Sequence, residues 1–220
     1  MKQKLLFLIM LAIGQFAKAQ VVINEYSCSN LSQYPDNFNK YEDWIELYNT
    51  TSTPFNINGY HLSDDSLSPT KYTIPNITIA ANGFVRFWCS GRNSFAGTHY
   101  HTNFKLKQCK NTKENIIFAN PNGVILDGLT VKKTQLSHSI GRKPNGDTTW
   151  GIFVTPTPNA SNNGSNQYAD YADKPDFSLQ PGIYSGSQSL TITTTEPNAT
   201  IRYTVDGTKP LTTSSIYTTP

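Results

Sequence analysis

This 220-residue sequence lacks any useful run of hydrophobic residues at the 3.6-residue period of an amphipathic helix, and residues that favour helices are scarce. It also lacks the Gly-x-Ser-x-Gly motif of serine hydrolases and the glycine-rich loop that holds phosphate ahead of a helix. Only four histidines and three cysteines are present. No catalytic constellation emerges, so the sequence predicts a non-helical protein that is not an enzyme and needs no cofactor.

Long hydrophobic runs are also missing, apart from Leu5–Ile13 near the start. Lys2 and Lys4 precede this run, and the small residues of Ala17–Ala19 follow it, as in a signal peptide cleaved after Ala19. The run is about half of the roughly 20 residues that a membrane span requires. No cysteine follows closely enough to carry a lipid. We therefore expect residues 1–19 to direct export, and the protein to be secreted or exposed at the cell surface without a transmembrane segment.

Charge is unevenly distributed along the chain. Residues 21–83 hold seven acids and two bases, whereas residues 84–143 hold ten bases and two acids. Removing Lys2, Lys4 and Lys18 with the signal peptide takes the formal charge of +3 to zero. A neutral protein lacks the long-range attraction typical of a nucleic-acid binder, which argues against a nucleic-acid partner. A nucleic-acid contact would depend on the basic stretch, which includes six lysines: Lys105, Lys107, Lys110, Lys113, Lys132 and Lys133.

The residues that are plentiful favour strands and turns: 12% are aromatic, with many Thr, Asn and Gly. Short alternations of apolar and polar residues recur at Val21–Tyr26, Trp44–Tyr48, Phe55–Leu62, Phe84–Cys89, Ile116–Ala119 and Val124–Val131. Between the last two, Asn120-Pro121-Asn122-Gly123 predicts a tight hairpin turn, because Asn-Gly tolerates positive φ. Many short strands of this kind predict an all-β antiparallel sandwich.

Six motifs occur in the order known from one family: Val21–Glu25, Asp43–Asn49, Gly59–Asp65, His101–Leu106, Ser139–Gly146 and Thr155–Asn159. Together they resemble the bacterial lamin-tail domain over residues 21–162. The resemblance implies an immunoglobulin-like antiparallel β-sandwich. Such domains occur in exported bacterial proteins, often beside enzymes or adhesion modules, and are thought to bind extracellular polymers.

A second unit follows a polar linker at residues 163–174. Phe177–Tyr184 and Ala199–Pro210 resemble the chitobiase/β-hexosaminidase C-terminal domain, a small β-sandwich. About 45 residues are too few to bury a stable sandwich core. We therefore expect residues 175–220 to be a truncated domain, and a catalytic domain could follow in the same polypeptide.

Exposed aromatic rings are the candidate contacts for a sugar polymer. We predict this role for Trp44, Trp88 and Tyr100, with Lys105 and Lys107 as nearby basic residues. Core packing is the alternative for Trp44, because large aromatic side chains are mostly buried.

A metal site has little support in the sequence. Glu25, Asp43 and Glu46 supply the oxygen atoms that calcium prefers, but their spacing matches no calcium loop. His99 and His101 lie on one side of an extended segment, yet no third ligand is evident. We therefore predict no metal.

The odd number of cysteines allows at most one intramolecular disulfide. A Cys89–Cys109 disulfide is favoured, which leaves Cys28 free or buried.

The preferred hypothesis is a non-catalytic exported module that binds or adheres to an extracellular polymer, most plausibly a glycan. One alternative is the N-terminal accessory region of a larger exported enzyme, such as a hydrolase or a spore-coat-H-type kinase-like protein. Another is a salt-sensitive contact between nucleic acid and the basic residues 84–143, with an affinity that falls steeply as salt is added.

Overall fold

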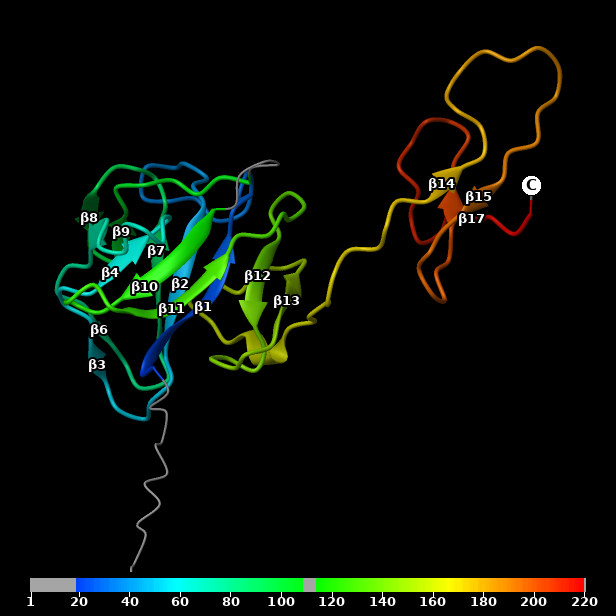
Figure 1. Ribbon diagram of the computed structural model, residues 1–220. Helices are drawn as coiled ribbons and strands as arrows, with labels where there is room; N and C mark the ends of the chain where they lie inside the picture. The colour runs from blue at the N-terminus through cyan, green and yellow to red at the C-terminus, as the bar shows by residue number, and fades with distance from the viewer. Residues whose placement is uncertain (1–18, 109–113, 220) are drawn as a thin grey trace, which may run out of the picture. The chain divides into compact units, whose positions relative to one another are not determined.

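The computed structural model describes residues 19–108 and 114–219, and the chain forms two compact units that divide between Ala169 and Asp170 (Figure 1). Both units are built from β-strands, and the described residues include one short 3-10 helix, η1 (Asn162–Gly164). This confirms the all-β prediction. Residues 1–18 of the signal peptide predicted at residues 1–19 lie outside the described residues.

The first unit has two principal sheets. The seven-stranded sheet has the order β13 (Trp150–Phe153), β12 (Ser139–Arg142), β1 (Val21–Ser27), β2 (Trp44–Asn49), β7 (Phe84–Trp88), β9 (His99–His101) and β8 (Ser94–Ala96). The four-stranded sheet has the order β11 (Ile125–Thr130), β10 (Asn115–Ala119), β4 (His61–Ser63) and β5 (Tyr72–Thr73). The smaller pair β3 (Phe55–Asn56) and β6 (Thr78–Ile79) accompanies them. Every pairing between these strands is antiparallel except that of β7 with β9.

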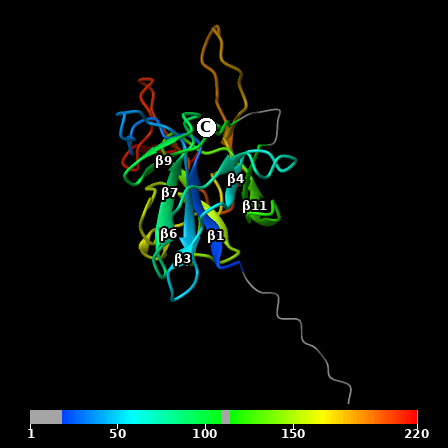
Figure 2. The ribbon, with the colours of Figure 1, turned by 90° about the vertical axis from the view of Figure 1, so that its left-hand side faces the viewer.

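The two sheets stack as layers of an immunoglobulin-like sandwich, with β7 and β9 in one layer and β4 and β11 in the other (Figure 2). Ile45 pairs with Phe87 across β2 and β7, so their side chains lie on the same face of the seven-stranded sheet. Both are fully buried, and the Phe87 ring meets Tyr72 of the four-stranded sheet at 6.3 Å between centroids. The hydrophobic core therefore lies between the sheets.

The opposite face of the seven-stranded sheet is also covered, but by irregular chain. The residues before β2 and those after β13 meet over it: the Tyr34 hydroxyl donates to the Pro156 carbonyl at 2.9 Å. Asn159 N–H donates to the Glu46 carboxylate on β2. The strands β1, β2 and β12 are therefore buried on both faces of the sheet.

The hairpin predicted at Asn120–Gly123 joins β10 and β11. Gly123 has φ of +76°, and its N–H donates to the Asn120 carbonyl at 2.9 Å. The positive φ explains why glycine occupies this turn.

Beyond residue 162 the chain remains attached to the first unit. Tyr168 exchanges two backbone hydrogen bonds with Ile152 of β13, at 2.7 and 3.0 Å. This contact covers the edge of the seven-stranded sheet and carries the unit on to Ala169. Part of the segment expected to be a linker is therefore ordered structure.

The second unit consists of two two-stranded sheets: β14 (Asp176–Phe177) with β15 (Ile192–Thr193), and β16 (Arg202–Tyr203) with β17 (Ser215–Ile216). Among its described residues, Ile192 is the only buried hydrophobic side chain. Val205 and Ile183 are fully or almost fully exposed. The described part of this unit thus has two small sheets and a very small hydrophobic core. No helix in the described part of the chain could cross a membrane.

Candidate functional site

Two buried glutamates hold the last loop of the first unit against the sheet. Glu25 and Glu46 stand opposite each other on β1 and β2, and both are fully buried. Glu25 accepts hydrogen bonds from Ser139 Oγ at 2.5 Å and from the N–H and hydroxyl of Thr157 at 3.0 and 2.7 Å. Glu46 accepts from Asn159 N–H and from Asn24 Nδ2. The two carboxylates therefore anchor the segment around Thr157, which explains why motifs so far apart in sequence occur together.

Burial is the main influence on these acids. It raises the pKa of Glu25, and for Glu46 burial and the neighbouring Glu25 charge raise the pKa well above its usual value. Asp43 lies apart from this pair, where its Oδ1 accepts from Asn30 N–H at 3.2 Å, and burial raises its pKa to about 7.

The three acids considered for calcium therefore do not form one group: Glu25 and Glu46 lie together, and Asp43 lies apart from them. In the described residues, no three His, Cys, Asp or Glu side chains are arranged to hold a metal ion. His99 accepts from Trp88 Nε1 at 3.3 Å, while His101 contacts Ser90 Oγ at 2.9 Å and Asn37 Oδ1 at 2.7 Å. The structure thus assigns both histidines to contacts within the chain.

The glutamate pair predicts an unusual pH dependence. Glu46 has an ordinary pKa of 4.5 when unfolded and a higher pKa when folded, so the folded protein retains a proton that the unfolded chain releases above pH 4.5. The free energy of unfolding should therefore decrease as the pH rises from 4.5. Glu46→Gln mimics the protonated carboxyl group, so we expect it to be more stable than the wild type at pH 8 and to show a shallower decline.

Chemical denaturation at pH 4.5, 6 and 8 measures this effect. Asp170→Asn, at an exposed position of the second unit, is the control. A Glu46→Gln protein whose stability declines with pH as steeply as that of the control would contradict the assignment.

Two of the predicted sugar contacts are buried, on the face of the seven-stranded sheet opposite that of Ile45 and Phe87. Trp44 and Trp88 pair across β2 and β7 and are only 0% and 1% exposed. Arg86 covers the Trp88 ring at 4.0 Å, and the irregular chain described above covers this face. The prediction that these rings are exposed is wrong, and the alternative core interpretation of Trp44 holds.

Tyr100 lies at the edge of the sandwich, with its ring supported by Phe87 at 5.6 Å and flanked by Phe95 at 6.4 Å. Phe95, which the sequence analysis missed, is 64% exposed. Lys105 Nζ forms an ion pair with the Glu42 carboxylate at 3.3 Å. Lys107 is exposed, and its backbone N–H donates to the Glu114 carboxylate. The predicted contacts therefore do not converge on one site.

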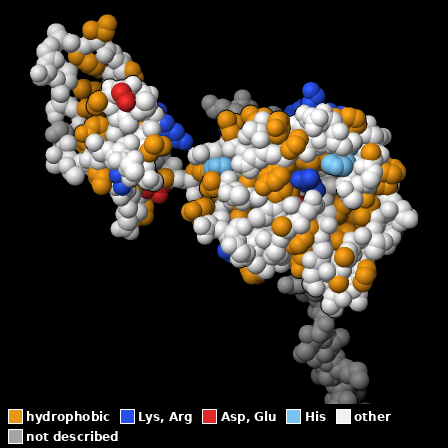
Figure 3. Space-filling view, turned by 180° about the vertical axis from the view of Figure 1, so that it is seen from behind, with side chains coloured by type: hydrophobic (Ala, Val, Ile, Leu, Met, Phe, Trp, Pro, Cys, Tyr) orange, Lys and Arg blue, Asp and Glu red, His pale blue; other side chains and the backbone are white. Residues whose placement is uncertain are grey.

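Acids from the first third of the chain pair with bases from the middle third. Arg92 bonds to Asp36 at 2.9 Å and to Glu42 at 3.1 Å, and its guanidinium lies 4.8 Å from the Phe38 ring. The Asp36 side chain is fully buried beneath it. In the view from behind, few acidic side chains show on the surface of the first unit (Figure 3). This pairing reduces the excess charge on which the nucleic-acid alternative depends.

Cys28 and Cys89 are buried thiols, and burial raises the pKa of Cys28 to about 12. The predicted Cys89–Cys109 disulfide involves a residue outside the described part of the chain. Two of the basic residues, Lys110 and Lys113, also lie outside it.

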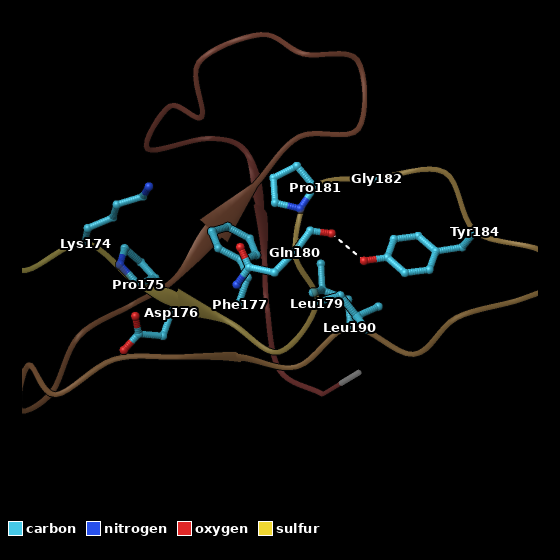
Figure 4. A pocket seen from close by; sticks show the side chains of 10 residues that line it. All are labelled: Lys174, Pro175, Asp176, Phe177, Leu179, Gln180, Pro181, Gly182, Tyr184 and Leu190. Atoms are coloured by element: carbon cyan, nitrogen blue, oxygen red, sulfur yellow. Dashed lines mark hydrogen bonds between the residues drawn. The ribbon is translucent and has the colours of Figure 1, made fainter.

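The second unit contains a hollow of about 590 Å³ (Figure 4). Its two aromatic rings are Phe177 on β14 and Tyr184, which are 49% and 45% exposed. The Tyr184 hydroxyl points toward Gln180 and donates to its carbonyl at 2.5 Å. The remaining lining residues are Lys174, Pro175, Asp176, Leu179, Pro181, Gly182 and Leu190. The hollow thus combines half-exposed rings with charged and amide groups.

The first unit is an immunoglobulin-like β-sandwich in which buried polar residues fasten the loops to the sheets. Residues 15–133 match the Lamin Tail Domain, and the chain belongs to this family. Residues 179–220 match the Chitobiase/beta-hexosaminidase C-terminal domain, so most of the hollow lies within that match.

The chain is also similar to a protein named "Endoglucanase" from Clostridium saccharobutylicum. The two are 41% identical over 67 residues, which make up 30% of this chain and 14% of that protein. The chain therefore spans a small part of this relative's length. The match associates part of the chain with a segment of a protein named for action on glucans.

Proposed function

We propose that this protein is an exported, non-catalytic module that binds an extracellular polysaccharide, and that the hollow of the second unit is its binding site. The observation that carries the proposal is the pair of half-exposed rings, Phe177 and Tyr184, in a hollow whose lining residues from Leu179 to Leu190 lie within the chitobiase/β-hexosaminidase match. The lamin-tail unit serves as the stable body that carries this site.

The lining suits a sugar ring. Aromatic faces pack against the apolar C–H surface of a pyranose, while polar groups fix its orientation through hydrogen bonds. Asp176 and Gln180 supply acceptors, and Lys174 and Gln180 supply donors for sugar hydroxyls. The proposed role of this site is binding without bond cleavage.

Phe177→Ala and Tyr184→Ala test this site. We expect each to weaken binding to the preferred polymer about tenfold or more, since the loss of a central aromatic contact typically costs about 2 kcal/mol or more and about 1.4 kcal/mol is tenfold in affinity. Affinity would be measured by titration with glycol chitin and hydroxyethylcellulose, two neutral soluble β-1,4-linked polymers. Tyr203→Ala removes a comparably exposed ring that does not line the hollow and is the matched control.

The proposal fails if the wild-type protein binds neither polymer. The assignment of the binding site to this hollow fails if Phe177→Ala and Tyr184→Ala both bind as tightly as the Tyr203→Ala control. Thermal unfolding of each variant would verify that the second unit remains folded.

A second candidate function is an accessory region of a larger exported enzyme. The endoglucanase match favours it, because this chain covers only 14% of that relative. The intact mass of the native exported protein distinguishes the two candidates. A mass near that of residues 20–220 supports an independent binding protein, whereas a much larger mass supports the accessory region.

A further inference from the structure

A smaller hollow opens where the first unit ends. Its volume is about 430 Å³, and it is lined by Val154, Thr155, Gly164, Ser165, Asn166 and Tyr168. Tyr168 and Val154 are 50% and 48% exposed, so an aromatic ring and an apolar side chain are available at its surface. No charged side chain lines it. Its chemistry is therefore that of hydroxyl, amide and aromatic groups.

The walls of this hollow are held by hydrogen bonds outside it. Tyr168 is tied to β13 by its two backbone bonds with Ile152. The Ser165 carbonyl accepts from Lys143 Nζ at 2.5 Å, and Ser165 N–H donates to the Asn162 carbonyl at 3.1 Å. The neighbouring Gln167 donates to the Gly141 carbonyl at 3.2 Å. A preformed wall reduces the ordering cost that binding has to overcome.

We propose that this hollow is a second polysaccharide subsite, located in the first unit and specific for an uncharged sugar residue. The Tyr168 ring provides the stacking face, and Thr155, Ser165 and Asn166 provide partners for sugar hydroxyls. A neutral lining favours a neutral ligand, because a charged sugar would lose hydration without gaining an ion pair. The inference rests on the proposed function and extends it to a second site.

The two subsites are close along the chain. Only residues 169–173 separate Tyr168 from Lys174, the first lining residue of the larger hollow. An extended chain spans at most about 3.6 Å per residue, so this connection limits their separation. If one polymer strand engages both subsites, the second contact becomes intramolecular. Linked sites of this kind gain up to about 10²–10⁴-fold in overall affinity over one site alone.

Tyr168→Ala tests the subsite, because it removes the ring while alanine retains the backbone bonds to Ile152. We expect it to lower the affinity for the bound polymer, glycol chitin or hydroxyethylcellulose, about tenfold. Its effect on the matching disaccharide, which is too short to occupy both subsites, should be smaller. Tyr41→Ala, at a similarly exposed ring elsewhere in the first unit, is the control. Binding should also change little between low and high salt at this subsite.

Each outcome separates the two proposals. If Phe177→Ala weakens binding and Tyr168→Ala matches the Tyr41→Ala control, the second subsite is refuted and the proposed function stands. If Tyr168→Ala weakens binding and Phe177→Ala does not, the first-unit subsite stands and the larger hollow is refuted as the principal site. If the wild-type protein binds neither polymer, both proposals fall.

Discussion

Replacing Arg142 with alanine will lower the free energy of unfolding by about 3–5 kcal/mol, the cost typical of removing one partner from a buried ion pair. Arg142 is only 8% exposed, and its Nη2 contacts both oxygens of Asp127 at 3.0 Å. Its Nε donates to the Ile23 carbonyl at 2.8 Å, and its Nη1 donates to the Asp147 carbonyl. The guanidinium also lies 4.5 Å from the Trp150 ring. One side chain thus joins β12 to β1, β11 and β13.

The loss is large because the variant leaves the buried partners of Arg142 without their hydrogen-bond donor. Asp127 Oδ2 still accepts from Ile23 N–H at 2.8 Å, but its charge loses the guanidinium that balances it. Arg142→Lys should recover only part of the stability, since an ammonium group cannot reproduce the planar fork that reaches several acceptors. Urea denaturation measures both variants, with Lys133→Ala at an exposed position as the control. An Arg142→Ala protein as stable as this control would refute the proposed role.

Gly141→Ala will destabilise the first unit by about 1–3 kcal/mol, the range for overpacking a core. A Cβ at this position would lie 2.7 Å from Asn162 Nδ2, 3.0 Å from Glu25 Cγ and 3.1 Å from Phe153 Cε2. Asn162 cannot move freely, because its Nδ2 donates to the Arg142 carbonyl and its Oδ1 accepts from Thr157. The added methyl group would therefore disturb the network that anchors the last loop.

The matched control is Gly164→Ala, where no atom lies within 4 Å of the new Cβ and φ is not positive. Thermal unfolding of both variants measures the difference. Equal melting temperatures for the two proteins would show that Gly141 is not needed for close packing.

The fold could be predicted because its signals are local. Alternating apolar and polar residues identify strands such as Trp44–Tyr48, and the Asn120–Gly123 turn fixes one hairpin. The ordered motifs then indicated the family. Their physical role became clear only in the structure, where Glu25 on β1 meets Ser139 and Thr157 from the far end of the unit.

The candidate site could not be predicted in the same way. Alternation places Trp44 and Trp88 on one face of a sheet, but it does not reveal whether that face is covered. Here the burial depends on the path of irregular chain around Tyr34 and Pro156, which has no periodic signal. Tyr168 lies in a stretch whose polar composition indicates a linker, and its order depends on two backbone bonds to a distant strand.

The most direct test of the account combines binding with an assay for chain cleavage. The full chain would be titrated with glycol chitin and hydroxyethylcellulose, and reducing ends would be measured after prolonged incubation with the same polymers. The account predicts saturable binding to at least one polymer and no release of reducing ends above that of buffer. Failure to bind either polymer would contradict the binding function, and release of reducing ends would contradict its non-catalytic nature.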